Sequence, residues 1–340
     1  MSKIYKYPHP FTTEGGYTFP QLEIAYDTFG TLNEDKSNVI WVCHALTANS
    51  DVADWWPHTV EQGCFLDPDK YFTVCANFLG SHYGTTGPLT VNPQTGEPWY
   101  GDFPLITVRD MVRVHQLLAE YLGIERVKLL IGSSIGGFQC LEWAVMQPDF
   151  AQKAAFIATT PRTLAWASGF NESQRMALEC DPTFGERSAE AGLAGMAVAR
   201  SIALLSYRGG MAYNISQEDA DPDNASFNRR VLSYQRYQGE KLRRRFNAYS
   251  YYRLSQAVDS HNLGRERGKV EDVLKTIKAK SLVVAITSDI IFPPEDHDIL
   301  VANIPDVTYR TIDSVFGHDG FLVEHKLLND IILDFIKDEQ

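Results

Sequence analysis

The sequence predicts an α/β protein with a mostly parallel central sheet and one large helical insertion. Strand-length apolar runs alternate with helical patterns toward both ends of the chain, as expected for a sheet covered by helices on both faces. The block from about residue 162 to residue 268 shows no such alternation and contains only helical patterns. We therefore expect residues 1–161 and 269–340 to form the sheet-containing core, and residues 162–268 to form a helical lid.

The composition indicates a sizeable buried core and argues against several classes of partner. Hydrophobic residues make up 44% of the 340 positions, and the net charge of −12 disfavours nucleic acid or an anionic membrane surface. No apolar run approaches the roughly 18 residues of a membrane span, and the N-terminal segment lacks the apolar core of a signal peptide. The five cysteines have no metal-ligand spacing. We expect a cytoplasmic protein with reduced thiols and no metal.

The first third of the chain predicts the N-terminal strands of the sheet. Residues 17–29 alternate between apolar and polar side chains, which favours antiparallel strands with one exposed face. Continuous apolar runs at 39–43 and 71–77 instead favour central parallel strands. A capping-box pattern, Thr107 with Asp110, then indicates the start of a helix. The change from antiparallel to parallel strands is therefore expected early in the chain.

The rest of the chain predicts the lid helices and then a return to the sheet. The helical patterns in the lid are rich in Arg, Tyr and Gln, and an acidic polar break separates two of them. Alternation of strands and helices resumes after the lid. The expected elements are a strand at 154–159, helices at 173–180, 190–207 and 226–260 with the break at 219–224, strands at 281–287 and 307–312, a helix after Pro294 and a closing helix at 320–337.

The strongest local signal is a Gly-x-Ser-x-Gly turn at 132–136. An apolar strand pattern runs into it and a helical pattern follows, a setting that holds a serine in a strained conformation at the top of a sheet. Glycine is expected at Gly132 and Gly136, because side chains there would collide where the strand and the helix approach each other. The helix N-terminus directs backbone N–H groups at whatever reacts with Ser134. Ser134 is therefore predicted to be a nucleophile.

The later part of the chain supplies a base and an acid that are able to activate Ser134. A serine hydroxyl needs a base that accepts its proton and an acid that orients the base. Asp289 follows the strand expected at 281–287, and His318 follows the strand expected at 307–312. The order serine, acid, histidine is the one found when the nucleophile lies on a strand–turn–helix elbow. We predict that Ser134, Asp289 and His318 form a catalytic triad.

Rival residues exist for two of these roles. Asp313 is another candidate acid, although it lies inside the last strand region. His44 and His325 are other candidate bases, although neither has the loop setting of His318. Two backbone N–H groups are expected to hold the oxyanion of the reaction, one from Ile135 and one from the loop after the strand at 39–43, for which we choose Leu46.

Six segments together resemble the homoserine O-acetyltransferase family of α/β-hydrolase-fold enzymes. The resemblance extends from about residue 9 to residue 337, and most of the segments are more specific than Gly-x-Ser-x-Gly. They are His44-Ala45-Leu46-Thr47, Gly84-Thr85-Thr86-Gly87-Pro88, Phe138-Gln139-Cys140-Leu141-Glu142-Trp143-Ala144, Tyr237-Gln238-Gly239, Ser288-Asp289-Ile290-Ile291-Phe292-Pro293 and Gly317-His318-Asp319-Gly320-Phe321-Leu322.

The resemblance implies both a reaction and its substrates. An acetyl group would pass from acetyl-CoA to Ser134 and then to the hydroxyl of L-homoserine, a step of methionine biosynthesis. Acetyl-CoA would be a co-substrate rather than a bound cofactor, and the lid helices would form a homodimer. Two charged residues resemble those that bind the zwitterionic acceptor, Arg200 for its carboxylate and Asp319 for its ammonium group. Arg208 is the nearest substitute for Arg200.

Two features depart from the family pattern. The family's elbow is usually Gly-Gly-Ser-Met-Gly-Gly, whereas this chain has Ser133 before the nucleophile and Ile135 after it. The lid is shorter around 208–228 and lacks the family's usual Arg-Phe-Gly-Arg segment. The backbone N–H of Ile135 is retained, so we expect the reaction class to be retained as well.

The residues expected around the acyl group favour acetyl-CoA over succinyl-CoA. Succinyl adds a carboxylate, which costs several kcal/mol to bury without a cationic partner. None of the residues that we place at the acyl pocket is cationic: they are Leu46, Ser133, Ile135, Phe138 and Trp166.

Several alternatives remain open at the level of sequence. Succinyl-CoA as donor or L-serine as acceptor would use the same chemistry, and an esterase or thioesterase would use the same triad with water. A binding module on an inactive hydrolase scaffold would be expected to have lost a triad residue, and none is missing. The basic run at 241–245 is a candidate for the CoA phosphates, but a solvated or dimer-facing helix surface is the favoured interpretation.

Overall fold

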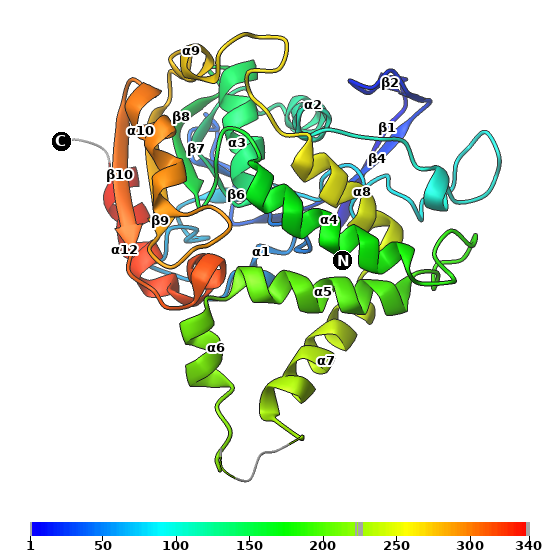
Figure 1. Cartoon of the computed structure of the whole chain (residues 1–340). Helices are drawn as coiled ribbons and strands as arrows, with labels where there is room; N and C mark the ends of the chain where they lie inside the picture. The colour runs from blue at the N-terminus through cyan, green and yellow to red at the C-terminus, as the bar shows by residue number, and fades with distance from the viewer. Residues whose placement is uncertain (1, 222, 224–226, 338–340) are drawn as a thin grey trace.

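The computed structural model describes residues 2–221, 223 and 227–337, and within them an eight-stranded sheet forms the centre of the molecule (Figure 1). Its order is β1-β4-β6-β5-β7-β8-β9-β10, and a separate short hairpin is formed by β2 and β3. The strands are β1 (Lys3–Tyr7), β2 (Phe11–Thr12), β3 (Thr18–Phe19), β4 (Leu22–Phe29), β5 (Val39–Cys43), β6 (Phe72–Ala76), β7 (Val127–Ser133), β8 (Ala151–Ile157), β9 (Lys280–Ile286) and β10 (Val307–Ile312).

The sheet is parallel from β6 to β10 and antiparallel at its other edge. β4 pairs antiparallel with both β1 and β6, whereas β5 pairs parallel with β6 and β7, and the parallel pairing continues through β8 and β9 to β10. The predicted mostly parallel α/β fold is therefore confirmed. Because the parallel strands end at one edge, the loops after β5, β7, β9 and β10 all lie there.

Alternate side chains of the central strands pack into different layers. In β5, Trp41 and Cys43 join the hydrophobic cluster formed with helices α2 and α3, whereas Ile40 and Val42 join the cluster formed with α1 and α12. This two-sided burial explains why the central strands read as continuous apolar runs. The helices outside the lid are α1 (Val52–Trp55), α2 (Val108–Tyr121), α3 (Ile135–Met146), α9 (Val270–Leu274), α10 (Asp298–Asn303), α11 (Gly320–Val323) and α12 (His325–Ile336), with short 3₁₀ turns at Tyr100–Asp102, Pro294–His297 and Gly317–Asp319.

Within the described residues, five helices lie between β8 and α9, in the part of the chain predicted to form the lid, and we refer to residues 162–268 as the lid. They are α4 (Ala165–Glu179), α5 (Leu193–Tyr207), α6 (Gly210–Ser216), α7 (Arg230–Arg243) and α8 (Ala248–Asp259). α5 packs against α4, α7 and α8, while α6 and α7 project from the rest of the molecule as the two sides of a V (Figure 1). None of the described helices is long and apolar enough to cross a membrane.

Two predicted strands and one predicted helix start are confirmed, whereas one long predicted helix is interrupted. The strands at 39–43 and 307–312 are confirmed, and Thr107 and Asp110 form the predicted capping box at the start of α2. The helix predicted at 226–260 is wrong in its continuity: it is interrupted after α7, and the Asn247 side chain accepts the Ser250 N–H to begin α8. Its first residue, and residues 222 and 224 of the polar break at 219–224, lie outside the described residues.

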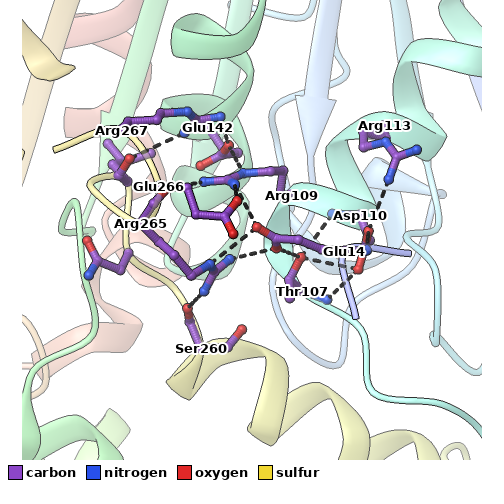
Figure 2. A network of polar contacts seen from close by, with 12 residues as sticks. Glu14, Thr107, Arg109, Asp110, Arg113, Glu142, Ser260, Arg265, Glu266 and Arg267 are labelled. Atoms are coloured by element: carbon purple, nitrogen blue, oxygen red, sulfur yellow. Dashed lines mark hydrogen bonds and ion pairs between the residues drawn. The ribbon is translucent and has the colours of Figure 1, made fainter. Parts of the chain in front are cut away.

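A buried ionic network fastens the end of the lid to helix α3 (Figure 2). Glu14, in the turn between β2 and β3, accepts hydrogen bonds from Arg109 Nη1 at 2.6 Å and from Arg265 Nη2 at 2.7 Å. Arg109 Nε also donates to Glu142 of α3 at 2.9 Å, and Arg267 binds the same carboxylate. Removing one partner of such a network leaves a buried charge uncompensated. The segment that returns from the lid is therefore held against α3.

The close approach between β7, α3 and β5 generates a prediction about stability. A Cβ atom at Gly136 would lie 2.1 Å from the Cys43 carbonyl oxygen, whereas a Cβ at Gly169, in the exposed part of α4, would meet no atom within 4 Å. Gly136→Ala should lower the free energy of unfolding by about 1–3 kcal/mol or more through overpacking. Gly169→Ala should leave it unchanged or raise it by up to about 1 kcal/mol, because alanine is a better helix former. Urea unfolding of both variants measures the difference, and equal effects would contradict the account.

Candidate active site

Ser134 lies between β7 and α3 in a backbone conformation that few non-glycine residues adopt. Its φ is 57° and its ψ is −125°, and its neighbours hold it there. The Ser134 N–H donates to the Ile157 carbonyl at 3.0 Å, and its own carbonyl accepts from Thr159 Oγ1 at 3.0 Å. A Cβ at Gly132 would lie 2.4 Å from the carbonyl carbon of Gly136, so the steric reason predicted for both glycines is confirmed.

His318 and Asp289 meet at the same edge of the sheet. His318 Nδ1 lies 2.6 Å from Asp289 Oδ2, and both side chains are buried. The other carboxylate oxygen of Asp289 accepts the backbone N–H groups of Ile291 at 2.8 Å and Phe292 at 3.1 Å. These donors fix the carboxylate opposite Nδ1, an arrangement that suits an imidazole with its proton on Nδ1 and with Nε2 as the acceptor.

The surroundings of His318 favour its protonated form. Burial alone would lower the pKa of the imidazole, but the charge and hydrogen bond of Asp289, together with the charge of Asp319, outweigh burial and raise the pKa above its usual 6.5. Such surroundings suit a group that takes up a proton and later gives it back.

The rival residues have other contacts. The exposed carboxylate of Asp313 accepts from Thr287 Oγ1 at 2.9 Å. His44 is buried, its Nδ1 donates to the Ala45 carbonyl at 2.8 Å, and burial lowers its pKa to about 4. His325 Nδ1 lies 3.2 Å from the Val323 carbonyl. His325 follows α11 in the sequence, whereas His318 precedes that helix. The geometry favours Asp289 and His318 for the two roles.

Two cavities meet at Ser134 and His318. The smaller has a volume of about 40 Å³ and is lined mainly by apolar side chains, among them Leu46, Ile135 and Phe138. The larger has a volume of about 390 Å³ and also includes Leu46. Leu46 and Ile135, the two residues predicted to supply oxyanion N–H groups, thus both border the nucleophile. The Ile135 N–H lies in the first turn of α3, where backbone donors lack intrahelical acceptors.

Two residues predicted at the acyl pocket lie elsewhere. Ser133 is buried within β7 and does not line the smaller cavity. Trp166 is 60% exposed, and its indole N–H donates to the Ile290 carbonyl at 2.6 Å. Strand alternation explains the first error, because consecutive residues of a strand point to opposite faces. None of the described residues that line the smaller cavity is a lysine or an arginine.

The larger cavity contains both residues predicted to bind the acceptor. Arg200 and Asp319 line it together with Ser134 and His318. Tyr207, which was not predicted, lines both cavities, and its ring lies 5.4 Å from the Arg200 guanidinium and 5.9 Å from the His318 ring. The spacing of seven residues between Arg200 and Tyr207 on one helix was a signal that could have identified it.

The basic run at 241–245 is divided between the wall of the larger cavity and the protein surface. Lys241 and Arg245 line the larger cavity, and Arg245 Nη1 also donates to the Thr47 carbonyl and to the Tyr83 hydroxyl. In contrast, Arg243 and Arg244 are exposed and pair with Glu240. Lys241 is nevertheless exposed, as the surface interpretation expects, whereas Arg245 is half-buried and lies beyond the end of α7.

Comparisons with known proteins agree with this geometry. A family model described as alpha/beta hydrolase fold matches residues 38–324. A homoserine O-acetyltransferase of Cyclobacterium marinum is 43% identical over 333 residues, which cover 98% of this chain and 94% of that protein. The solved homoserine O-acetyltransferase from Bacillus anthracis has a TM-score of 0.90 at 24% identity, covering 100% of this chain and 98% of that chain. The solved esterase E22 has a TM-score of 0.89 at 25% identity, covering 99% and 100%.

The environment of His318 generates a prediction about pH. If His318 is the base, the rate of Ser134 acylation by a chromogenic acetate ester should rise with pH along a limb whose midpoint lies above 6.5, because the neutral imidazole is required. Asp289→Asn removes the negative charge that raises the pKa, so the limb should move to lower pH and the rate should fall by roughly a hundredfold or more. Asp313→Asn is the matched control and should change neither. A shifted limb in Asp313→Asn with Asp289→Asn unaffected would reassign the acid.

Proposed function

The chain belongs to the homoserine O-acetyltransferase family, and we propose that it transfers an acetyl group from acetyl-CoA to the hydroxyl of L-homoserine through an acetyl ester of Ser134. This reaction supplies methionine biosynthesis. The observation that supports it most is the presence of an opposite-charge pair, Arg200 and Asp319, in the cavity that also contains Ser134 and His318. A zwitterionic amino acid needs one cation and one anion to aim its hydroxyl.

The first half-reaction acylates the enzyme. Ser134 Oγ attacks the thioester carbonyl while His318 Nε2 accepts the hydroxyl proton. The N–H groups of Ile135 and Leu46 stabilise the oxyanion of the tetrahedral intermediate. The C–S bond then breaks, the CoA sulfur takes the proton from His318, and free CoA leaves an acetyl ester on Ser134.

The second half-reaction transfers the acetyl group. Arg200 binds the carboxylate of homoserine and Asp319 binds its ammonium group, so that the hydroxyl lies near the ester carbonyl. His318 accepts the hydroxyl proton as the oxygen attacks, and the proton passes to Ser134 Oγ as the ester bond to the enzyme breaks. The products are O-acetyl-L-homoserine and the free serine.

Water is the competitor that the site must exclude. Water at about 55 M opposes an acceptor at about millimolar concentration, so positioning must supply roughly 6–7 kcal/mol in favour of homoserine. The lid and the charge pair are suited to this task. An esterase is the second candidate function, because the solved esterase E22 is similar over nearly the whole chain.

The two cavities suggest where the two parts of the acyl-CoA donor bind, the acyl group in one and the CoA phosphates in the other. The smaller cavity, with mainly apolar walls and no lysine or arginine among its described residues, suits an acetyl methyl group better than a succinyl carboxylate. Lys241 and Arg245 in the larger cavity are suited to the phosphates of CoA. A comparison of kcat/KM for acetyl-CoA and succinyl-CoA tests the first assignment, and a higher value for succinyl-CoA would contradict it.

The proposed assembly and location rest on other features. A homodimer through the lid helices is supported by large apolar side chains exposed on the V formed by α6 and α7, including Met211, Ile215 and Leu232. The acetyl-CoA donor and five cysteines without disulfide partners support a cytoplasmic location.

The proposal predicts that Ser134→Ala abolishes acyl transfer. With acetyl-CoA and homoserine, release of free thiol should fall by more than about a thousandfold, because no acyl-enzyme forms. Ser133→Ala is a matched control: it removes a neighbouring hydroxyl that is buried and has no hydrogen-bond partner in the described structure, so turnover should be retained. Near-normal thiol release by Ser134→Ala would overturn the mechanism.

A further inference from the structure

The connection between lid helices α5 and α6 packs against the loop that carries His318. Gly317 has a φ of 62°, and a Cβ atom there would lie 2.5 Å from the Gly209 nitrogen and 2.9 Å from the Tyr207 carbonyl oxygen. A Cβ at Gly209 would lie 3.0 Å from the Val315 carbonyl oxygen. The two backbones therefore touch at a place with no room for side chains. The α5–α6 connection is therefore in direct contact with the loop that carries His318.

Arg208 forms the ionic contact across this junction. It follows the last residue of α5 in an extended conformation, and its Nε lies 3.0 Å from Asp319 Oδ2. The Arg208 side chain is 32% exposed and that of Asp319 is 14% exposed. Within the described residues, Arg208 is the only hydrogen-bond or ion-pair partner of the Asp319 carboxylate. The contact thus fixes one oxygen of Asp319 and leaves the other for a ligand.

Arg208 itself lies behind the site rather than in it. Asp319 and Arg200 line the larger cavity, but Arg208 lines neither cavity. Its guanidinium instead lies 5.9 Å from the ring of Tyr234, on α7. Arg208 is therefore held between the base of the α6–α7 arm and the carboxylate next to His318.

We propose that Arg208 is a positioning residue: it holds the Asp319 carboxylate in the orientation that receives the ammonium group of the acceptor, and Arg200 alone binds the acceptor carboxylate. This rests on the proposed function. Without Arg208, Asp319 loses its ionic partner at a site that is largely shielded from water, and the carboxylate is free to rotate. Recognition of the ammonium group is then lost while the acyl-enzyme still forms.

A double-mutant cycle tests the proposal. Arg208→Met, Asp319→Asn and the double variant are compared by kcat/KM for homoserine, with active sites counted by the burst of thiol released from acetyl-CoA, so that misfolded protein does not enter the result. Arg208→Met should lower kcat/KM by roughly tenfold to a hundredfold, more than it lowers the burst rate. In the Asp319→Asn background the same change should cost less than about twofold. Arg244→Met, on the exposed face of the lid, is the matched control and should retain full activity.

Fragments of the acceptor separate the two arginines. 3-Aminopropan-1-ol has the ammonium group without the carboxylate, and 4-hydroxybutyrate has the carboxylate without the ammonium group. Arg208→Met should reduce acetylation of the first and spare the second, and Arg200→Met should do the reverse.

Three results would overturn the role of Arg208 while leaving acyl transfer intact. They are full activity of Arg208→Met, additive losses in the double variant, and a selective loss of 4-hydroxybutyrate acetylation in Arg208→Met. A wild-type enzyme that gives no thiol burst with acetyl-CoA would instead overturn the proposed function.

Discussion

The close approach of β5, β7 and helix α3 is the constraint on which the site depends. Gly132 and Gly136 bring the strands and the helix so near that a single methyl group would collide with backbone atoms. The chain turns between them with a positive φ at Ser134, which directs the hydroxyl out of the sheet into the two cavities. The same turn starts α3, so the N–H of Ile135, next to Ser134, has no intrahelical acceptor.

The remaining parts of the site are arranged around that turn by the parallel sheet and the lid. β9 and β10 are neighbours in the sheet and end at the same edge as β7, which brings Asp289 and His318 together although they are 29 positions apart in the sequence. The lid contributes Arg200, Tyr207, Lys241 and Arg245 to the larger cavity, and the sheet-containing core contributes its other charged and aromatic side chains, among them Asp319. The ionic network centred on Arg109 and Glu142 fastens the returning end of the lid to α3 itself (Figure 2). The nucleophile and its cover are therefore attached to one helix.

Much of this was predictable from sequence, and the exceptions have physical causes. The elbow and the strands ending before Asp289 and His318 follow from local patterns, since apolar runs and glycine spacing are local signals. Lid contacts are tertiary: the sequence offered both Arg200 and Arg208 as carboxylate ligands, and only the packing shows that Arg208 faces Asp319. Ser133 and Trp166 were misplaced because which way a side chain points depends on strand register and helix rotation.

The central claim is that the site selects an amino-acid hydroxyl over water for the acyl-enzyme, and the partition of the acetyl group tests it most directly. With acetyl-CoA as donor, O-acetylhomoserine and free acetate are measured together while homoserine is varied through the millimolar range. The account predicts that the ester accounts for nearly all of the CoA released at millimolar homoserine, and that thiol release is slow without it. Acetate as the main product at every homoserine concentration would contradict the account and identify a hydrolase.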